Sequence, residues 1–224
     1  MCRQLILNFH GLGEPPPSVE PEERLYWLSK KSFSRLLNQI SDYSEIEPKI
    51  SLTFDDGNAS DVLIALPELI SRELTASFFV CPGRIGDRNY LDKAMIKELT
   101  GAGMCVGSHG MNHRDWRRLD SDALEIEISG ARRELEDIIG QPVTNVSIPF
   151  GSYDRRILRR LVQENWDVIY TVDGGFALNT LKLKPRTSIT SNMLGYDFLK
   201  ELMRTPRLHT RLRRSLTRVW KRLR

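Results

Sequence analysis

Residues 49–57, KISLTFDDG, combine a short apolar strand pattern with two adjacent carboxylates. Apolar and polar side chains alternate up to Phe54, as expected for a strand with one buried face. Asp55 and Asp56 follow directly, and Gly57 provides the backbone freedom for a turn. An Asp-Asp-Gly run alone is commonly only a turn signal. Its position at the end of an apolar strand favours a functional loop.

Similar apolar runs recur along the chain and alternate with longer amphipathic stretches. The further strand candidates are QLILNF from Gln4, ASFFV from Ala76, MCVG from Met104, NVSIPF from Asn145, DVIYTV from Asp167 and RTSIT from Arg186. The helical candidates are residues 33–40, 62–73, 93–100, 121–139 and 155–164. This alternation predicts the α/β class with a parallel sheet, either a barrel or an open doubly wound sheet. In both architectures the functional loops follow the carboxyl ends of the strands.

Length and composition predict one folded domain. The 224 residues are 40% hydrophobic and 28% charged, a globular balance. No apolar run reaches the roughly 18 residues that span a bilayer, and the first ten residues lack the apolar core of an export signal. The three cysteines form no CxxC pair, which argues against a disulfide framework and a thiolate zinc site. We therefore expect a cytoplasmic protein, and the absence of a phosphate-loop pattern implies no nucleotide cofactor.

Chemically capable side chains gather at the predicted strand ends. His10 follows the first strand, and Asp55 and Asp56 follow the second. His109 and His113 lie four residues apart in SHGMNH, so one turn of helix would let both imidazoles reach one ion. Two histidines and one carboxylate form a metal site with open positions, and the second carboxylate is then free to act as a base. An isolated pair of histidines could equally be engaged in ordinary hydrogen bonds.

Three motifs in order give a specific resemblance: TFDDG at 53–57, SHGMNH at 108–113 and IPFG at 148–151. Together they resemble the polysaccharide deacetylase family, also called the NodB homology domain or carbohydrate esterase family 4, over residues 50–186. The resemblance implies a single-domain, distorted (β/α)7-type barrel. It implies a metal-dependent hydrolase that removes an N-acyl group, in particular N-acetyl, from an amino sugar of a saccharide. Hydrolysis of another non-peptide amide, formyl and cyclic amides included, and saccharide binding without catalysis are the alternatives.

The resemblance also implies roles for individual residues. By position in the first motif, Asp55 is the catalytic base. Asp56, His109 and His113 would hold one divalent metal ion, which is usually zinc in the family. The third motif would contact the substrate and supply a backbone N–H to the oxyanion. The residues expected to contact the substrate are Pro149, Phe150 and Gly151 of this motif and Tyr153, two residues after it.

The sequence departs from the family pattern where two catalytic side chains are expected. The third motif of the family carries an arginine two residues before its proline, and here Ser147 stands at that position. We expect Arg186, in KPRTSIT, to supply the guanidinium for Asp55, as in the exopolysaccharide-biosynthesis branch that the chain resembles; the alternative is a surface charge. The late leucine-and-histidine motif, the usual source of the general acid, is not evident. His10 is our candidate for an acid or substrate contact, and a hydrogen-bonded loop histidine is the alternative.

The last part of the chain differs in composition. We expect residues 1–203 to form the catalytic domain and residues 204–224 a basic, helical segment, because the latter contain neither Asp nor Glu. Apolar residues recur there at helical spacing: Leu208, Leu212, Leu216 and Val219. Such a segment suits either a solvated helix or a peripheral contact with the inner face of the membrane. The expected partner is an N-acylated saccharide, and no nucleic acid is expected.

Overall fold

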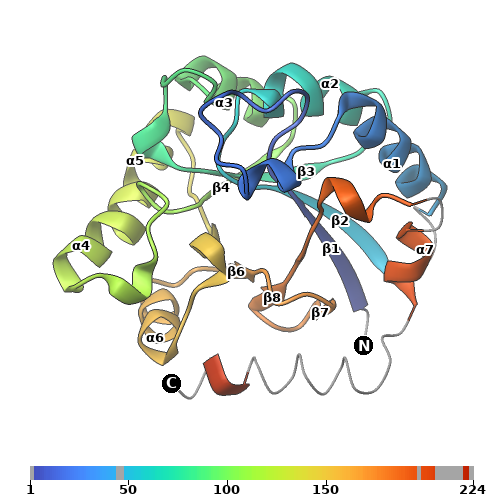
Figure 1. Ribbon diagram of the computed structural model, residues 1–224. Coiled ribbons are helices and arrows are strands. Elements are labelled where there is room, and N and C mark those ends of the chain that lie inside the picture. Colours follow the sequence, from blue (N-terminus) through green and yellow to red (C-terminus); the bar gives the residue numbers. More distant parts are fainter. Residues whose placement is uncertain (1–2, 44–47, 196–197, 205–218, 222–224) are drawn as a thin grey trace.

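A computed structural model describes residues 3–43, 48–195, 198–204 and 219–221. A single curved sheet forms the centre, with helices α1 to α6 around its outer side (Figure 1). The strands are β1 Arg3–Phe9, β2 Lys49–Phe54, β3 Ala76–Val80, β4 Cys105–Ser108, β5 Asn145–Ser147, β6 Val168–Thr171, β7 Phe176–Leu178, β8 Leu183–Pro185 and β9 Thr187–Ser188. The helices are α1 Lys30–Asp42, α2 Leu66–Ile70, α3 Lys93–Gly101, α4 Ser121–Glu125, α5 Ala131–Ile139, α6 Arg155–Gln163 and α7 Phe198–Met203.

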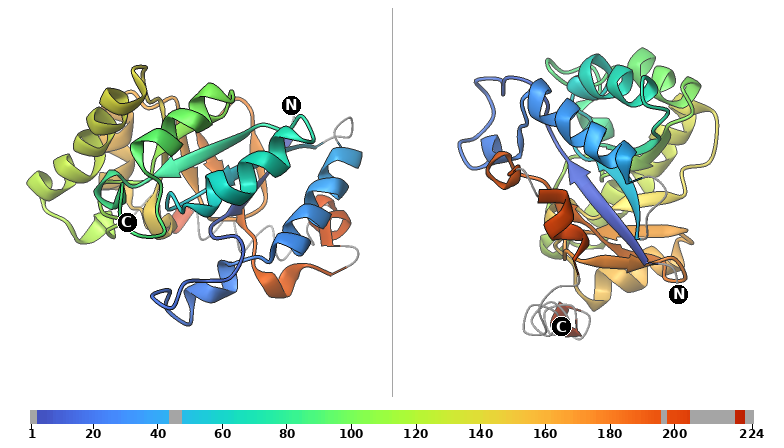
Figure 2. Two further views of the ribbon diagram at one scale, coloured as in Figure 1. Left: turned by 90° about the horizontal axis from the view of Figure 1, so that it is seen from above. Right: turned by 90° about the vertical axis from the view of Figure 1, so that its right-hand side faces the viewer.

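The sheet is parallel for most of its width. Its order is β7-β1-β2-β3-β4-β5-β6-β8, and only β7 runs antiparallel to its neighbour. Strands that are consecutive in sequence are therefore adjacent from β1 to β6, with helical crossovers between them. Figure 2 shows the curvature that brings the two edges of the sheet toward each other.

A short segment, residues 183–188, links the two edges. Strand β8 pairs with β6, with Pro185 opposite Thr171, and β9 pairs with β1, with Thr187 opposite Leu7. Arg186 lies between these two pairings. The six strands β1 to β6 and this bridging segment form the nearly closed, distorted (β/α)7-type barrel that the sequence predicts.

Strand alternation separates an apolar outer layer from a polar interior. The ring of Phe54 stacks between those of Phe9 and Phe78, at centroid distances of 5.1 and 4.7 Å, and Phe33 of α1 packs edge-on against Phe9. These residues belong to the main hydrophobic core. Because neighbouring strand residues point to opposite faces, the residue before Phe54, Thr53, points into the barrel. The interior positions can then carry the site.

Some predicted elements differ in detail. The helix expected at residues 121–139 contains a π-helical turn, Ile126–Gly130, between α4 and α5, and the helix expected at 62–73 begins with another, Asp61–Ala65. The strand expected from Arg186 is shorter, and β7 and β8 were not predicted, because runs of three residues leave no periodic signal.

Most of the helix expected in the tail, including Leu208, Leu212 and Leu216, lies outside the described residues; residues 219–221 are helical. Within the described ranges, no helix is both long and apolar enough to cross a membrane.

The phenylalanine layer should dominate stability. We expect Phe78→Ala to lower the free energy of unfolding by about 3–5 kcal/mol, because Phe78 is fully buried and stacks on Phe54, so that its loss leaves a cavity. Val162→Ala on α6, where the side chain is 60% exposed, should change it by less than about 0.5 kcal/mol. Urea unfolding followed by circular dichroism measures both. Equal effects would contradict this description of the core.

Candidate active site

A cleft of about 340 Å³ opens at the carboxyl ends of the strands. The loops after β1, β2 and β4 each bring a predicted site residue to it. Its lining includes His10, Asp55, Asp56, His109, His113 and Phe150. Residues within 19–27 form another wall, with Tyr26 and Trp27 among them. The fold thus brings together side chains that are up to 140 residues apart in the sequence.

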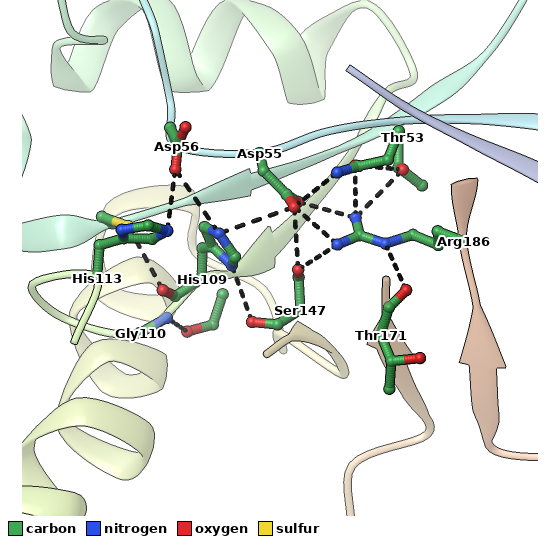
Figure 3. A network of polar contacts seen from close by, with 12 residues as sticks. Thr53, Asp55, Asp56, His109, Gly110, His113, Ser147, Thr171 and Arg186 are labelled. Carbon is green, nitrogen blue, oxygen red and sulfur yellow. Dashed lines mark hydrogen bonds and ion pairs between the residues drawn. The ribbon is translucent and has the colours of Figure 1, made fainter. Parts of the chain in front are cut away.

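The three predicted metal ligands face one another (Figure 3). Asp56 Oδ1 lies 3.4 Å from His113 Nε2 and 3.7 Å from His109 Nε2. One ligand atom from each residue lies within 4.8 Å of the other two. Asp56 Oδ1 is buried and has no hydrogen-bond partner among the described residues. A buried carboxylate oxygen without a donor, beside two imidazole nitrogens, fits a divalent cation.

The ring orientation of His109 is fixed by a carbonyl. Its Nδ1 lies 2.9 Å from the backbone oxygen of Ser147. Because a carbonyl oxygen can only accept, Nδ1 must carry the proton, and Nε2 is left with a lone pair facing Asp56. This is the tautomer that a metal ligand requires.

Two of the three ligands have strained backbones. Asp56 has φ +78° and His113 has φ +53°, in the left-handed region that residues other than glycine rarely adopt. Such strain persists only where surrounding contacts enforce it, and it clusters at functional sites. The positions of both side chains are therefore imposed by their neighbours.

Asp55 lies beside the triad, inside the barrel, and is held by an arginine. Arg186 Nη1 and Nη2 donate to its two carboxylate oxygens at 2.8 and 2.7 Å. Asn8 Nδ2 donates to Oδ2 at 2.9 Å, and the Ser147 hydroxyl donates to the same atom at 3.3 Å. Burial alone would raise the pKa of Asp55, but the positive charge and the hydrogen bonds of Arg186 outweigh it and hold the pKa well below its usual range. Asp55 is therefore ionised.

Arg186 is itself completely buried. Its guanidinium lies over the rings of Phe79 and Tyr170, at 5.3 and 5.5 Å from their centroids. Nη2 also lies 2.6 Å from the hydroxyl of Ser147, the position at which the family pattern has its arginine. The guanidinium thus comes from the residue between β8 and β9 and lies in contact with that position. The alternative of a surface charge is excluded by its burial.

Burial and neighbouring groups also shift the pKa values of the predicted metal ligands. Desolvation together with the nearby His109 lowers the pKa of His113 from 6.5 to about 4. Burial would raise the pKa of Asp56, but the imidazoles of His113, His10 and His109 favour its carboxylate when they are protonated and lower the pKa on balance. In neutral solution the triad therefore presents a carboxylate and an uncharged His113, the forms that bind a cation.

The third motif contributes one side chain to the cleft. Phe150 is 59% exposed, has φ +58°, and packs against His113 at a centroid distance of 4.4 Å. Pro149 and Gly151 are buried. Tyr153, predicted as a substrate contact, is also buried: its hydroxyl donates to Asp173 at 2.6 Å, and it does not line the cleft. Of these four residues only Phe150 lines the cleft, so a side-chain contact with the substrate remains a prediction for Phe150 alone.

Several site residues were not singled out from the sequence. Asn8 and Thr53 are polar residues at inward positions of apolar strands, and this local signal could have indicated them. Arg84, which lies 3.7 Å from Asp56, and the aromatic residues Tyr26 and Trp27 come from loops without a motif. Their proximity follows only from the tertiary structure.

Comparison with known proteins adds a decisive observation. The sequence profile described as polysaccharide deacetylase matches residues 42–169, more than half of the chain. The chain belongs to the polysaccharide deacetylase family. It is 23% identical over 201 residues to the putative polysaccharide deacetylase YxkH of Bacillus subtilis, covering 82% of this chain and 72% of that protein. It is 30% identical over 112 residues to a chitooligosaccharide deacetylase of Rhizobium leguminosarum bv. trifolii, covering 50% of each.

Solved structures of deacetylases share the fold. The Streptococcus pyogenes deacetylase PplD, solved in complex with acetate, superposes with a TM-score of 0.79 at 22% identity, over 91% of this chain and 99% of that one. IcaB from Ammonifex degensii gives a TM-score of 0.71 at 18% identity, over 90% of this chain and 96% of that one. Both neighbours confirm the predicted deacetylase barrel.

The buried ion pair should behave as a unit. We expect Arg186→Met to lower the free energy of unfolding by about 3–5 kcal/mol, because it leaves the Asp55 carboxylate buried without its counter-charge. Adding Asp55→Asn should restore part of that loss, which a double-mutant cycle in urea measures. Arg159→Met, at an exposed position of α6, is the matched control and should change stability little. Additive effects of the two site variants would contradict the pairing.

The lowered pKa of His113 predicts how stability depends on pH when a chelator has removed metal. Between the ordinary value of 6.5 and about 4, the unfolded chain binds more protons at this residue than the folded one. Stability should therefore fall as the pH decreases from 7 to 4.5, with a contribution from His113 of about 2–3 kcal/mol. Urea unfolding at both pH values measures it. A His113→Gln variant should lose that part of the decrease, and an unchanged decrease would contradict the assignment.

Proposed function

We propose that this protein is a metal-dependent N-deacetylase that hydrolyses the N-acetyl group of an amino sugar in a saccharide. The observation that carries the proposal is that two adjacent carboxylates, Asp55 and Asp56, have different partners. Asp55 is held by Arg186, whereas the buried oxygen of Asp56 has no hydrogen-bond partner among the described residues and faces two imidazoles. One carboxylate is thus organised to accept a proton and the other to hold a cation. Membership of the deacetylase family supports this chemistry.

Asp55 would act as the general base toward a water molecule in the cleft. Its ionised form is secured by Arg186, and its Oδ2 lies 3.7 Å from His109 Nε2 at the edge of the triad. The charge of Arg186 also makes Asp55 a weak base, so the attacking water needs further activation. Asp56, His109 and His113 would hold a divalent ion, which we propose to be zinc. Such an ion polarises an acyl oxygen and lowers the pKa of water, which suits a weak base.

The departing nitrogen must gain a proton before it can leave. His10 lines the same cleft, and its ring packs against that of Tyr26 at a centroid distance of 4.9 Å. His10 Nδ1 is buried without a hydrogen-bond partner in the described part of the chain. A ring held in place on the cleft wall can deliver a proton, and we assign His10 this role. The backbone N–H of Phe150 would stabilise the oxyanion.

The cleft supports a saccharide as substrate. Tyr26, Trp27, Tyr90 and Phe150 contribute aromatic surface, onto which the apolar faces of sugar rings can pack. Glu22 and Glu23 add hydrogen-bond acceptors for hydroxyl groups at the same wall. The named activity of the chitooligosaccharide deacetylase relatives supports an N-acetylated amino sugar.

We also propose where in the cell the protein acts. The basic residues of 204–224 would hold the protein at the anionic inner face of the membrane, where a saccharide precursor would be its substrate. The exposed side chains of Val219 and Trp220 support a surface contact. Fractionation of cells tests this placement, and recovery of the protein from the culture medium would overturn it.

The activity is tested by purifying the wild type and Asp55→Asn without chelator. We expect about one zinc per chain in both proteins, because Asp55 is not a ligand. Acetate release from N-acetylglucosamine oligomers should fall by at least about 100-fold in Asp55→Asn, since the base is lost. Chelation should abolish wild-type turnover, and added zinc should restore it. His10→Asn in the same assay should bind zinc normally and lower kcat.

Each failure has a separate meaning. A wild type that binds zinc without releasing acetate would refute the N-acetyl substrate while leaving the metal site. A wild type that binds no divalent ion would refute the catalytic assignment as a whole. An active Asp55→Asn would refute the role of the base.

A further inference from the structure

Glu127 is a buried carboxylate that the proposed chemistry does not use. It is 1% exposed and lies in the π-helical turn Ile126–Gly130. Among the described residues it forms no ion pair with Lys or Arg, in contrast to its exposed neighbour Glu125, which pairs with Arg133 and Arg160. Burial of an unpaired carboxylate is costly unless hydrogen bonds compensate for it. π-Helical turns occur frequently at functional sites.

Both carboxylate oxygens of Glu127 accept hydrogen bonds from the segment 111–116, which contains His113. Oε1 accepts from the backbone N–H of Asn112 at 3.0 Å, and Oε2 accepts from Trp116 Nε1–H at 3.3 Å. The backbone carbonyl of Glu127 accepts from the N–H of Met111 at 3.1 Å. One residue thus contacts the turn on both sides of His113.

The turn is shaped around this carboxylate. A Cβ atom at Gly110, which has φ +79°, would lie only 2.8 Å from Glu127 Oε2. On the opposite side, the N–H of Gly83 donates to the carbonyl of Met111 at 2.9 Å. The segment between His109 and His113 is therefore held between two fixed points.

The unfavourable backbone of His113 makes such support necessary. Its φ of +53° persists only if neighbouring contacts fix the backbone around it, and Glu127 binds the backbone N–H of the residue before it, Asn112. Relaxation would turn the imidazole away from Asp56, which lies 3.4 Å from it.

We infer that Glu127 is a positioning residue of the metal site: its carboxylate holds the turn 111–116 in the conformation that presents His113 to Asp56 and His109. This inference rests on the proposed function, because it concerns the metal triad assigned there. It predicts that a residue that neither lines the cleft nor belongs to the triad affects the metal affinity.

The test measures zinc affinity by competition with a chromophoric chelator in the wild type and in Glu127→Gln. The amide keeps the volume, but its NH2 group only donates, so glutamine can accept from the Asn112 N–H or from Trp116 Nε1–H and not from both. We expect the Kd for zinc to rise 10- to 100-fold and the d–d spectrum of the cobalt-substituted protein to change. Glu125→Gln on the same helical stretch should leave both unchanged. Glu127→Asp, which keeps the charge but shortens the side chain, should give an intermediate Kd.

The outcomes separate this inference from the proposed function. A wild type that binds neither zinc nor cobalt would refute both. Wild-type Kd and cobalt spectrum in a folded Glu127→Gln would refute the positioning role alone. If Glu127→Gln does not fold, Glu127→Asp decides: a wild-type Kd and spectrum would refute the role, and a raised Kd with a melting temperature like that of Glu125→Gln would support it.

Discussion

The interior of this barrel is organised around one buried ion pair, Asp55 with Arg186. Removing two charges from water is costly, and a buried pair is tolerated only when its remaining hydrogen-bonding groups are satisfied. Asn8 of β1 and Thr53 of β2 meet the guanidinium at 2.7 and 3.2 Å, and Ser147 of β5 meets it at 2.6 Å. These partners come from three strands, so the register between strands is tied to the electrostatics of the site. A shift by one residue would point an apolar side chain at a charge.

Ser147 connects the two halves of the site. Its hydroxyl contacts both members of the ion pair, and its carbonyl fixes the proton of His109 (Figure 3). The side chain of Ser147 thus contacts the proposed base, Asp55, and its backbone contacts a proposed metal ligand, His109. A serine is small enough to leave room for a guanidinium that arrives from the segment between β8 and β9. The site therefore keeps a positive charge beside Asp55, although the residue that supplies it is Arg186 and not an arginine at position 147.

Most of the candidate site could be predicted from short sequence patterns, because each pattern lies in a loop that follows one strand of the barrel. Asp55, Asp56, His109 and His113 lie directly after strands, and strand order alone brings their loops together. Glu127 and Tyr153 show where that reasoning ends. A glutamate within an amphipathic helix looks like a solvated residue, and only the inserted π-helical turn directs it inward. Tyr153 looked like a substrate contact because it follows the third motif, yet the turn at Gly151 carries it away from the cleft into the core.

The bridging segment 183–188 has two tasks in the folded protein. It joins the two edges of the sheet, through β8 to β6 and through β9 to β1, and it carries Arg186 between these two pairings. Arg186 is also the group that keeps the buried Asp55 carboxylate ionised. Closure of the barrel and the protonation state of Asp55 therefore depend on the same six residues.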